Sequence, residues 1–134
     1  MTAIAKIEGI GAIYKEKLVA AGIKTVEKLL EVGAGAKARE ELAAKTGIPV
    51  KLILEWVNLA DLMRIKGVGE EYSDLLEEAG VDTIAELANR KADSLLAKIW
   101  QTNAKEKLVR RPPNLKKIQG WVEQAKKLPR KVEY

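Results

Sequence analysis

The fold of this chain is decided by a stretch that occurs twice, IEGIGAIYKEKLVAAGIKT at residues 7–25 and IKGVGEEYSDLLEEAGVDT at residues 65–83. When residues 7–29 are aligned with residues 65–87, nine of the 23 positions are identical. The identical pairs are Ile7/Ile65, Gly9/Gly67, Gly11/Gly69, Tyr14/Tyr72, Leu18/Leu76, Ala21/Ala79, Gly22/Gly80, Thr25/Thr83 and Leu29/Leu87. Ordered identities at one fixed shift indicate an internal repeat. Two copies of one structural unit are therefore expected.

Glycines mark the ends of the first helix in each copy. Gly-x-Gly precedes the helix and Ala-Gly follows it, with a glycine that can take positive φ. Tyr14 and Leu18 are four residues apart and so lie on one face of the predicted helix. Thr25 and Thr83 stand where the next helix needs an N-cap, and Glu86 has the spacing of a capping box with Thr83.

A third helix is expected in each copy. In the first copy it is GAKAREELAAKTG, residues 35–47, which ends at a glycine. Its counterpart is ADSLLAKIWQTN, residues 92–103, and Asp93 is the expected N-cap.

The fourth helix of each copy is predicted to begin at a proline, Pro49 in the first copy and Pro113 in the second. Similarity returns there, because ILEWVNLA (53–60) matches IQGWVEQA (118–125) at a shift of 65 instead of 58. The second copy therefore holds seven extra residues between Leu87 and Trp121.

Apolar residues nowhere alternate with period two over the length of a strand. The expected fold is all-α, with two tandem repeats of about four helices each, residues 1–64 and 65–134, packed as one pseudo-symmetric unit.

The composition excludes several kinds of chemistry. Hydrophobic residues make up 47% of the 134 residues and charged residues 32%, which is typical of a folded helical protein. The absence of cysteine and histidine excludes disulfides, thiolate or imidazole metal sites and nucleophiles that depend on histidine. The sequence has no apolar run long enough for a membrane span and no signal peptide pattern, so a cytoplasmic location is expected.

Charge is unevenly distributed along the chain. The net charge is +5, but residues 1–64 carry +2, residues 65–104 carry −4 and residues 105–134 carry +7. The positive net charge mildly favours anionic partners, and the chain is polarised, with an acidic middle and a basic end.

The repeated unit resembles the helix-hairpin-helix motif, with hairpins at residues 8–11 and 66–69. The chain is also similar to a widespread family of tandem helix-hairpin-helix (SAM-like) proteins of bacteria and archaea that is classed as a domain of unknown function. The resemblance covers residues 7–134. It is carried by EWVNLADLMRIKGVGEEYSDLLEEAGVDTIAELANRK, by LVRRPPNLKKIQGWVEQAKKL and by the final VEY.

The resemblance implies binding of nucleic-acid backbone without regard to sequence. Gly9, Ile10 and Gly11 would form the phosphate cradle, and Lys15 and Lys17 would add positive potential. A tight turn between packed helices explains the same glycines without any ligand.

The second hairpin does not share the implied function. Residues 65–87 carry a net charge of −6, with Glu70 and Glu71 directly after Gly69. These carboxylates take up the positive potential at the helix start that would otherwise attract a phosphate, so phosphate binding is not assigned to this hairpin.

The basic end offers the other candidate contacts with an anionic partner. Four of its residues are predicted to bind nucleic acid: Arg110, Arg111, Lys116 and Lys117. The alternative is a solvated rim around the start of a helix, which is what most such charge runs are.

The aromatic residues are expected to pack instead of stacking on a ligand. Tyr14 and Tyr72 lie on the apolar faces of their helices, as do Trp56 and Trp121, which are expected to face the hairpins or the other copy. Trp100 is less constrained and is expected to be partly exposed.

No arrangement of residues indicates catalysis. The sequence has no nucleophile elbow, no phosphate loop and no complete dinucleotide fingerprint. The chain is therefore predicted not to be an enzyme, with no cofactor, no metal, no small-molecule substrate and no membrane partner.

Two functions remain open. The first is binding of nucleic-acid backbone through the first hairpin and the basic end. The second is a protein-interaction or self-association scaffold, in which the acidic middle of one molecule meets the basic end of another.

Overall fold

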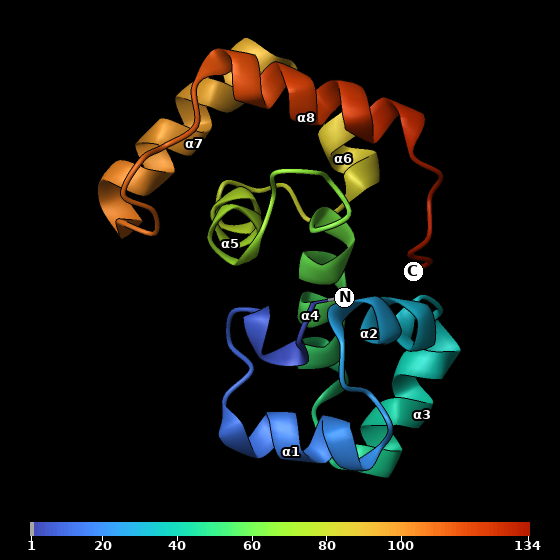
Figure 1. Cartoon of the computed structure of the whole chain (residues 1–134). Coiled ribbons are helices and arrows are strands. Elements are labelled where there is room, and N and C mark those ends of the chain that lie inside the picture. The colour runs from blue at the N-terminus through green and yellow to red at the C-terminus, as the bar shows by residue number, and fades with distance from the viewer. Residues whose placement is uncertain (1) are drawn as a thin grey trace. The chain divides into compact units, whose positions relative to one another are not determined.

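Eight α-helices and one short 3-10 helix make up the regular structure of this computed structural model, which describes residues 2–134 (Figure 1). The elements are η1 (Ile4–Lys6), α1 (Ala12–Ala20), α2 (Val26–Gly33), α3 (Ala36–Thr46), α4 (Val50–Leu62), α5 (Glu70–Glu78), α6 (Ile84–Ala88), α7 (Ala92–Glu106) and α8 (Leu115–Lys127). Within residues 2–134 no strand forms, and extended backbone pairs at one isolated antiparallel bridge, between Ala3 and Thr25. The predicted all-α class is confirmed.

The chain divides into two units. Unit 1 holds Met1–Asp61 and Lys131–Tyr134, and unit 2 holds Leu62–Arg130. The sequence placed the boundary after residue 64 and assigned the last four residues to the second half, whereas here those residues belong to unit 1. That the halves are repeats packed as one pseudo-symmetric unit stays a prediction.

The buried side chain of Arg39 explains why the last residues belong to unit 1. Arg39 is 3% exposed, and its guanidinium donates to the carbonyl oxygens of Ala34 (3.0 Å) and Glu133 (2.6 Å). The N–H of Glu133 donates to the carbonyl of Ala34 at 2.8 Å, and the hydroxyl of Tyr134 donates to Asn58 Oδ1 at 2.9 Å. The bonds to Glu133 and from Tyr134 join residues far apart in the chain, so no local sequence pattern predicts them.

In unit 1 the hairpin turn lies against Trp56 of α4. Trp56 is 2% exposed, and the centre of its ring lies 5.2 Å from that of Tyr14 in an edge-on arrangement. Gly9 has a φ of +92°, and a Cβ added to it would lie 3.4 Å from Trp56 Nε1. Any other residue would be strained by this φ, so glycine allows the turn to close over the indole.

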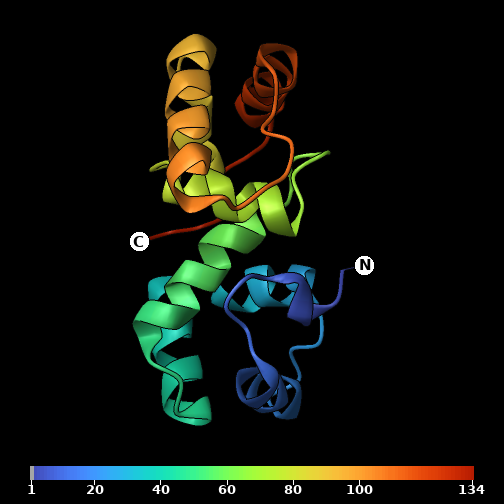
Figure 2. The ribbon, with the colours of Figure 1, turned by 90° about the vertical axis from the view of Figure 1, so that its left-hand side faces the viewer.

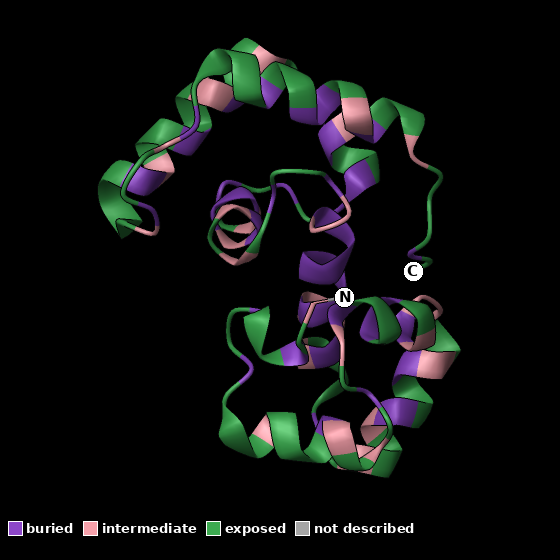
Figure 3. Cartoon of the chain, in the orientation of Figure 1, coloured by how far each residue is buried: buried purple, intermediate pink, exposed green. Residues whose placement is uncertain are grey.

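Unit 2 repeats this construction. The ring centres of Tyr72 and Trp121 lie 5.2 Å apart, Gly67 has a φ of +97°, and its added Cβ would lie 3.5 Å from Trp121 Nε1. Trp121 belongs to α8, which packs against α6 and α7 (Figure 2). Figure 3 shows the buried positions of α8 on its inner side and the exposed ones on its outer side. The predicted packing roles of the two tyrosines and these two tryptophans are confirmed.

The predicted helix ends are largely confirmed. Thr25 Oγ1 accepts from the N–H of Lys28 at 3.0 Å, and Thr83 Oγ1 accepts from the N–H of Glu86 at 3.3 Å. The Glu86 carboxylate accepts from the N–H of Asp82 at 3.1 Å, so the capping box closes one residue earlier than its usual form. α4 and α8 follow their prolines as predicted.

The predicted start of α7 at Ala92 is confirmed, but its predicted N-cap and its predicted end are wrong. The helix begins at Ala92 with Lys91 as N-cap, and Asp93 lies inside the first turn, where its carboxylate accepts from the N–H of Ser94 at 2.9 Å. An acidic residue in the first turn is favoured by the helix dipole without being the cap. The helix also continues past Asn103 to Glu106, because the Asn103 side chain bonds forward to Val109 and does not end the helix.

No helix within residues 2–134 has both the length and the apolar run needed to cross a bilayer.

The glycine that follows the first helix of unit 2 supplies a clean test of backbone strain. Gly80 has a φ of +94° with nothing near its Cβ position, whereas Gly120 lies within α8 with equally open space. We expect Gly80→Ala to lower the free energy of unfolding by about 1–2 kcal/mol because of its left-handed backbone. The control Gly120→Ala should raise it by about 0.5–1 kcal/mol because alanine favours the helix. Urea titrations followed by circular dichroism measure both values, and equal effects of the two substitutions would contradict the strain.

Candidate nucleic-acid interface

The first hairpin exposes its two outer glycines and buries the residue between them. Gly9 and Gly11 are exposed, while Ile10 is 8% exposed and its N–H donates to the carbonyl of Ile7 at 3.3 Å. Ile10 therefore anchors the turn, and the surface that a phosphate could approach is formed by the backbone of Gly9 and Gly11.

Helix α1 begins from this turn without a side-chain cap. Its N-cap is Gly11, and its first turn contains no acidic residue. The N–H groups of the first turn of a helix have no partner within the helix. In α2 the Thr25 hydroxyl takes one of these groups, but Gly11 has no side chain to do so. The start of α1 is therefore open to an anion.

The two lysines of α1 differ in their relation to the hairpin. Lys15 is exposed one turn after Gly11, and its N–H donates to the Gly11 carbonyl at 2.9 Å. Lys17 lies in the last turn of α1, and its Nζ is 4.0 Å from the Cβ position of Gly47 at the end of α3. Residues two apart on a helix do not share a face, so Lys15 is the lysine placed to serve the hairpin.

The second hairpin also precedes a helix with a glycine N-cap, but acidic and amide side chains of the protein itself lie at this hairpin. Glu70 and Glu71 lie in the first turn of α5. The side chain of Gln124 accepts from the N–H of Lys66 at 2.9 Å and donates to its carbonyl at 3.2 Å. The matching position in the first copy is Leu59, which has no group for such bonds. This hairpin is thus occupied internally.

The loop between α7 and α8 is part of the seven-residue insertion. Residues 107–114 connect these helices, whereas residues 47–49 suffice between α3 and α4. The loop accounts for five of the seven extra residues. α7 is longer than α3, with 15 residues against 11, but this is largely offset by α6, which has 5 residues where α2 has 8. We call residues 107–114 the basic loop.

Side chains from the rest of unit 2 hold the basic loop at three points. Asn103 accepts from the N–H of Val109 at 2.9 Å and donates to its carbonyl at 3.0 Å. The hydroxyl of Tyr72 donates to the carbonyl of Arg111 at 3.1 Å. The indole N–H of Trp100 donates to the carbonyl of Pro113 at 2.8 Å. Because these bonds tie down backbone groups, the loop is fixed while its arginine side chains stay exposed.

All four predicted basic residues of unit 2 are exposed: Arg110, Arg111, Lys116 and Lys117. Lys117 Nζ lies 5.6 Å from the centre of the Tyr72 ring, which already gives it a cation–π partner. The basic loop belongs to unit 2 and the first hairpin to unit 1, so each is a candidate surface by itself.

Sequence reasoning missed the residues that shape the basic loop. Asn103 was interpreted as the end of a helix, and Tyr72 was interpreted only as a packing residue. Trp100 was expected to be partly exposed, which its 51% exposure confirms. The bond from Trp100 to Pro113 could not be predicted from the sequence. The only hint was that Trp100 does not fall on the regular apolar face of a predicted helix.

Several other carboxyl groups lie outside the first hairpin and the basic loop. The pKa of Glu27 is lowered, chiefly because its carboxylate accepts from the backbone N–H of Thr2 at 2.9 Å. The pKa of Asp82 is raised, chiefly by burial and then by the charge of Glu86. On α5 three carboxylates lie within 4.8 Å of one another, those of Asp74, Glu77 and Glu78. None of these groups belongs to either candidate surface.

The model of the family described as Domain of unknown function (DUF4332) matches residues 8–128, which is most of the chain. Comparison with curated proteins and with solved structures found no match.

The Asn103 bonds to the basic loop can be tested against a second asparagine. Asn103→Ala would leave the buried N–H and carbonyl of Val109 without partners, so we expect a loss of about 2–3 kcal/mol in the free energy of unfolding. The control is Asn89→Ala, which removes an exposed bond to the carbonyl of Ala85 and should cost less than about 0.5 kcal/mol. Hydrogen exchange of the Val109 amide should accelerate in Asn103→Ala alone. Unchanged exchange there would show that this bond does not hold the loop.

Proposed function

We propose that this chain, which belongs to the DUF4332 family, is a non-catalytic module that binds nucleic-acid backbone without reading its sequence. The contacts would be the first hairpin, through Gly9, Gly11 and Lys15, and the basic loop with the start of α8. We place this activity in the cytoplasm, and it needs no cofactor.

The reading of both units as tandem helix-hairpin-helix repeats is part of this proposal. It is supported by the shared order of a glycine turn, an uncapped helix, a glycine with positive φ and a threonine-capped helix. In that motif the backbone of the turn approaches a phosphate, which requires no side chain to contact a base.

The observation that carries the proposal is the basic loop. Its backbone is fixed at Val109, Arg111 and Pro113, so arginine side chains are presented from a rigid support. Exposed guanidinium groups on a fixed backbone suit phosphate oxygens, because less conformational freedom is lost on binding.

The first hairpin adds a second kind of contact. An open helix start offers N–H donors and a positive dipole end, and Lys15 adds a charge one turn away. The acidic second hairpin, closed by Gln124, is left out of the interface.

Binding of this kind should be strongly dependent on salt, since each neutralised phosphate releases counterions. In a plot of the logarithm of the binding constant against that of the salt concentration, we expect Arg110→Gln/Arg111→Gln to lower the slope by about 2 and Lys15→Gln by about 1. The control Lys91→Gln/Lys98→Gln removes two exposed charges from α7 and its N-cap and should leave the slope unchanged. Fluorescence anisotropy with labelled single strands and duplexes between about 50 and 200 mM salt measures these slopes. If neither probe binds at the low salt, the proposed function is wrong.

A self-association scaffold is the second candidate, and the acidic surface of α5 favours it. Five of the nine residues of this helix are acidic, and the basic loop carries the opposite charge. Opposite charges on separate molecules steer association and set its salt dependence.

If this second candidate is correct, the mass measured by light scattering should fall as salt rises. Glu70→Gln/Glu71→Gln should then weaken association by roughly 2–10-fold, because exposed charge pairs contribute little individually. The matched control is Glu40→Gln/Glu41→Gln, an exposed pair on α3, which should have no effect. A monomer at every concentration and salt would exclude self-association.

A further inference from the structure

We propose that the exposed ring of Trp100 stacks on an unpaired base, so that the ligand of the basic loop is single-stranded nucleic acid. This inference rests on the proposed function and names its substrate class. The first observation is exposure: Trp100 is 51% exposed, whereas Trp56 is 2% and Trp121 is 4% exposed. The two buried tryptophans pack the hairpins, and Trp100 takes no part in either arrangement.

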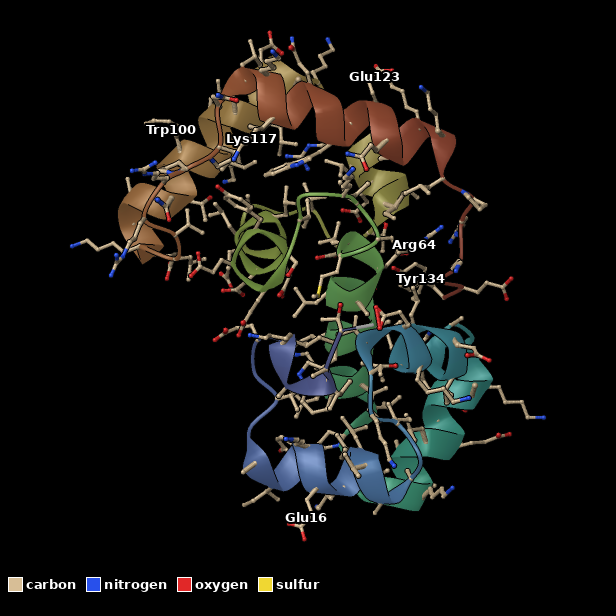
Figure 4. All side chains as sticks on the ribbon, in the orientation of Figure 1. Glu16, Arg64, Trp100, Lys117, Glu123 and Tyr134 are labelled. Atoms are coloured by element: carbon tan, nitrogen blue, oxygen red, sulfur yellow. The ribbon has the colours of Figure 1, made fainter. Side chains whose placement is uncertain are left out.

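The indole of Trp100 is held in place by its polar edge. Its N–H donates to the Pro113 carbonyl at 2.8 Å, so the ring's only donor is satisfied and the ring is tied to the basic loop. The rest of the ring is apolar, and about half of the residue, 51%, is exposed beside the segment that leads into α8 (Figure 4). A ring oriented before binding loses little freedom when a base stacks on it.

Cationic residues flank the attachment point of this ring in the sequence. Arg111 lies two residues before Pro113 and is exposed. Asn114 follows Pro113 and accepts from the N–H of Lys117, so the same short segment ends at the basic start of α8. An aromatic platform beside several cations is the arrangement by which proteins hold single strands, with the bases on the ring and the phosphates on the cations.

This arrangement distinguishes single strands from duplexes. In a duplex the faces of the bases are already stacked on one another, so an exposed indole finds no free face without unstacking them. A duplex would meet the arginines alone, whereas a single strand would gain the stacking contact as well. The ring therefore adds affinity for single strands only.

An exposed tryptophan beside arginines also occurs at protein interfaces. The charge of +7 over residues 105–134 favours a polyanion over a protein of ordinary surface charge. A protein partner is an outcome that the experiment below can reveal.

The test uses the full chain and two variants that differ only in the ring. Trp100→Phe and Trp100→Leu both lose the bond to Pro113, but only phenylalanine keeps an aromatic face. The probes are labelled oligothymidine of about 20 nucleotides and a duplex of the same length, with affinities measured by anisotropy at low salt. Circular dichroism shows whether each variant is folded.

For the single strand, we expect Trp100→Leu to bind about ten-fold or more weakly than Trp100→Phe, as loss of one stacked base predicts. For the duplex, the two variants should bind equally. Quenching of intrinsic fluorescence by oligothymidine should also be lost when Trp100 is replaced.

Two outcomes would overturn the inference. If the two variants bind the single strand equally while Arg110→Gln/Arg111→Gln weakens both probes, the proposed function stands and the stacking role of Trp100 fails. If the unaltered chain binds neither probe, both proposals fail, and a protein partner becomes the better explanation of the exposed ring.

Discussion

The contact on which each unit depends is an indole ring packed between a tyrosine ring and a glycine turn. Trp56 meets Tyr14 and Gly9 in unit 1, and Trp121 meets Tyr72 and Gly67 in unit 2. The indole comes from the fourth helix of its unit and the turn precedes the first, so this contact joins the two ends of a four-helix segment. Because burial of an aromatic ring is a large contribution to stability, the turn and its helix are fixed before any ligand is present.

This contact explains how much of the fold the sequence could predict. The identities between the copies belong to this contact, to helix ends or to the buried core: glycines and tyrosines, alanines and threonines, and leucines and isoleucines. Each obeys a local rule on φ, capping or helical spacing, so the pattern can be interpreted without coordinates. Most charged positions are exposed and are not needed for these contacts, so they can differ between the copies. Gly11 and Lys15 could therefore be named as candidate site residues from the sequence. The sequence could not predict that the side chain of Lys17 extends toward Gly47.

What the sequence could not predict are bonds from side chains to distant backbone. Gln124 closes the second hairpin, Trp100 reaches Pro113, and Arg39 holds the carbonyl of Glu133. Each is a polar side chain whose local surroundings are compatible with simple exposure to solvent. Asn103 was misinterpreted for the same reason. Asparagine favours helix ends, and only the structure shows that this side chain instead bonds to the backbone of Val109. The shape of the basic loop depends on such bonds. The sequence therefore identified a run of basic residues, but it could not predict how these residues are arranged on the surface.

The placement of charge on two helices favours the start of α8, which follows the basic loop, over the acidic helix α5 as the proposed binding surface. Glu70 and Glu71 lie at the positive start of α5, where the helix dipole stabilises them and no ligand is needed to explain them. Lys116 and Lys117 lie in the first turn of α8, where the dipole opposes positive charge. The cap of Asn114 and the ring of Tyr72 offset this cost only in part. Residues that break a local rule are expected where function requires them, and an anion placed between the helix start and these lysines would remove the conflict.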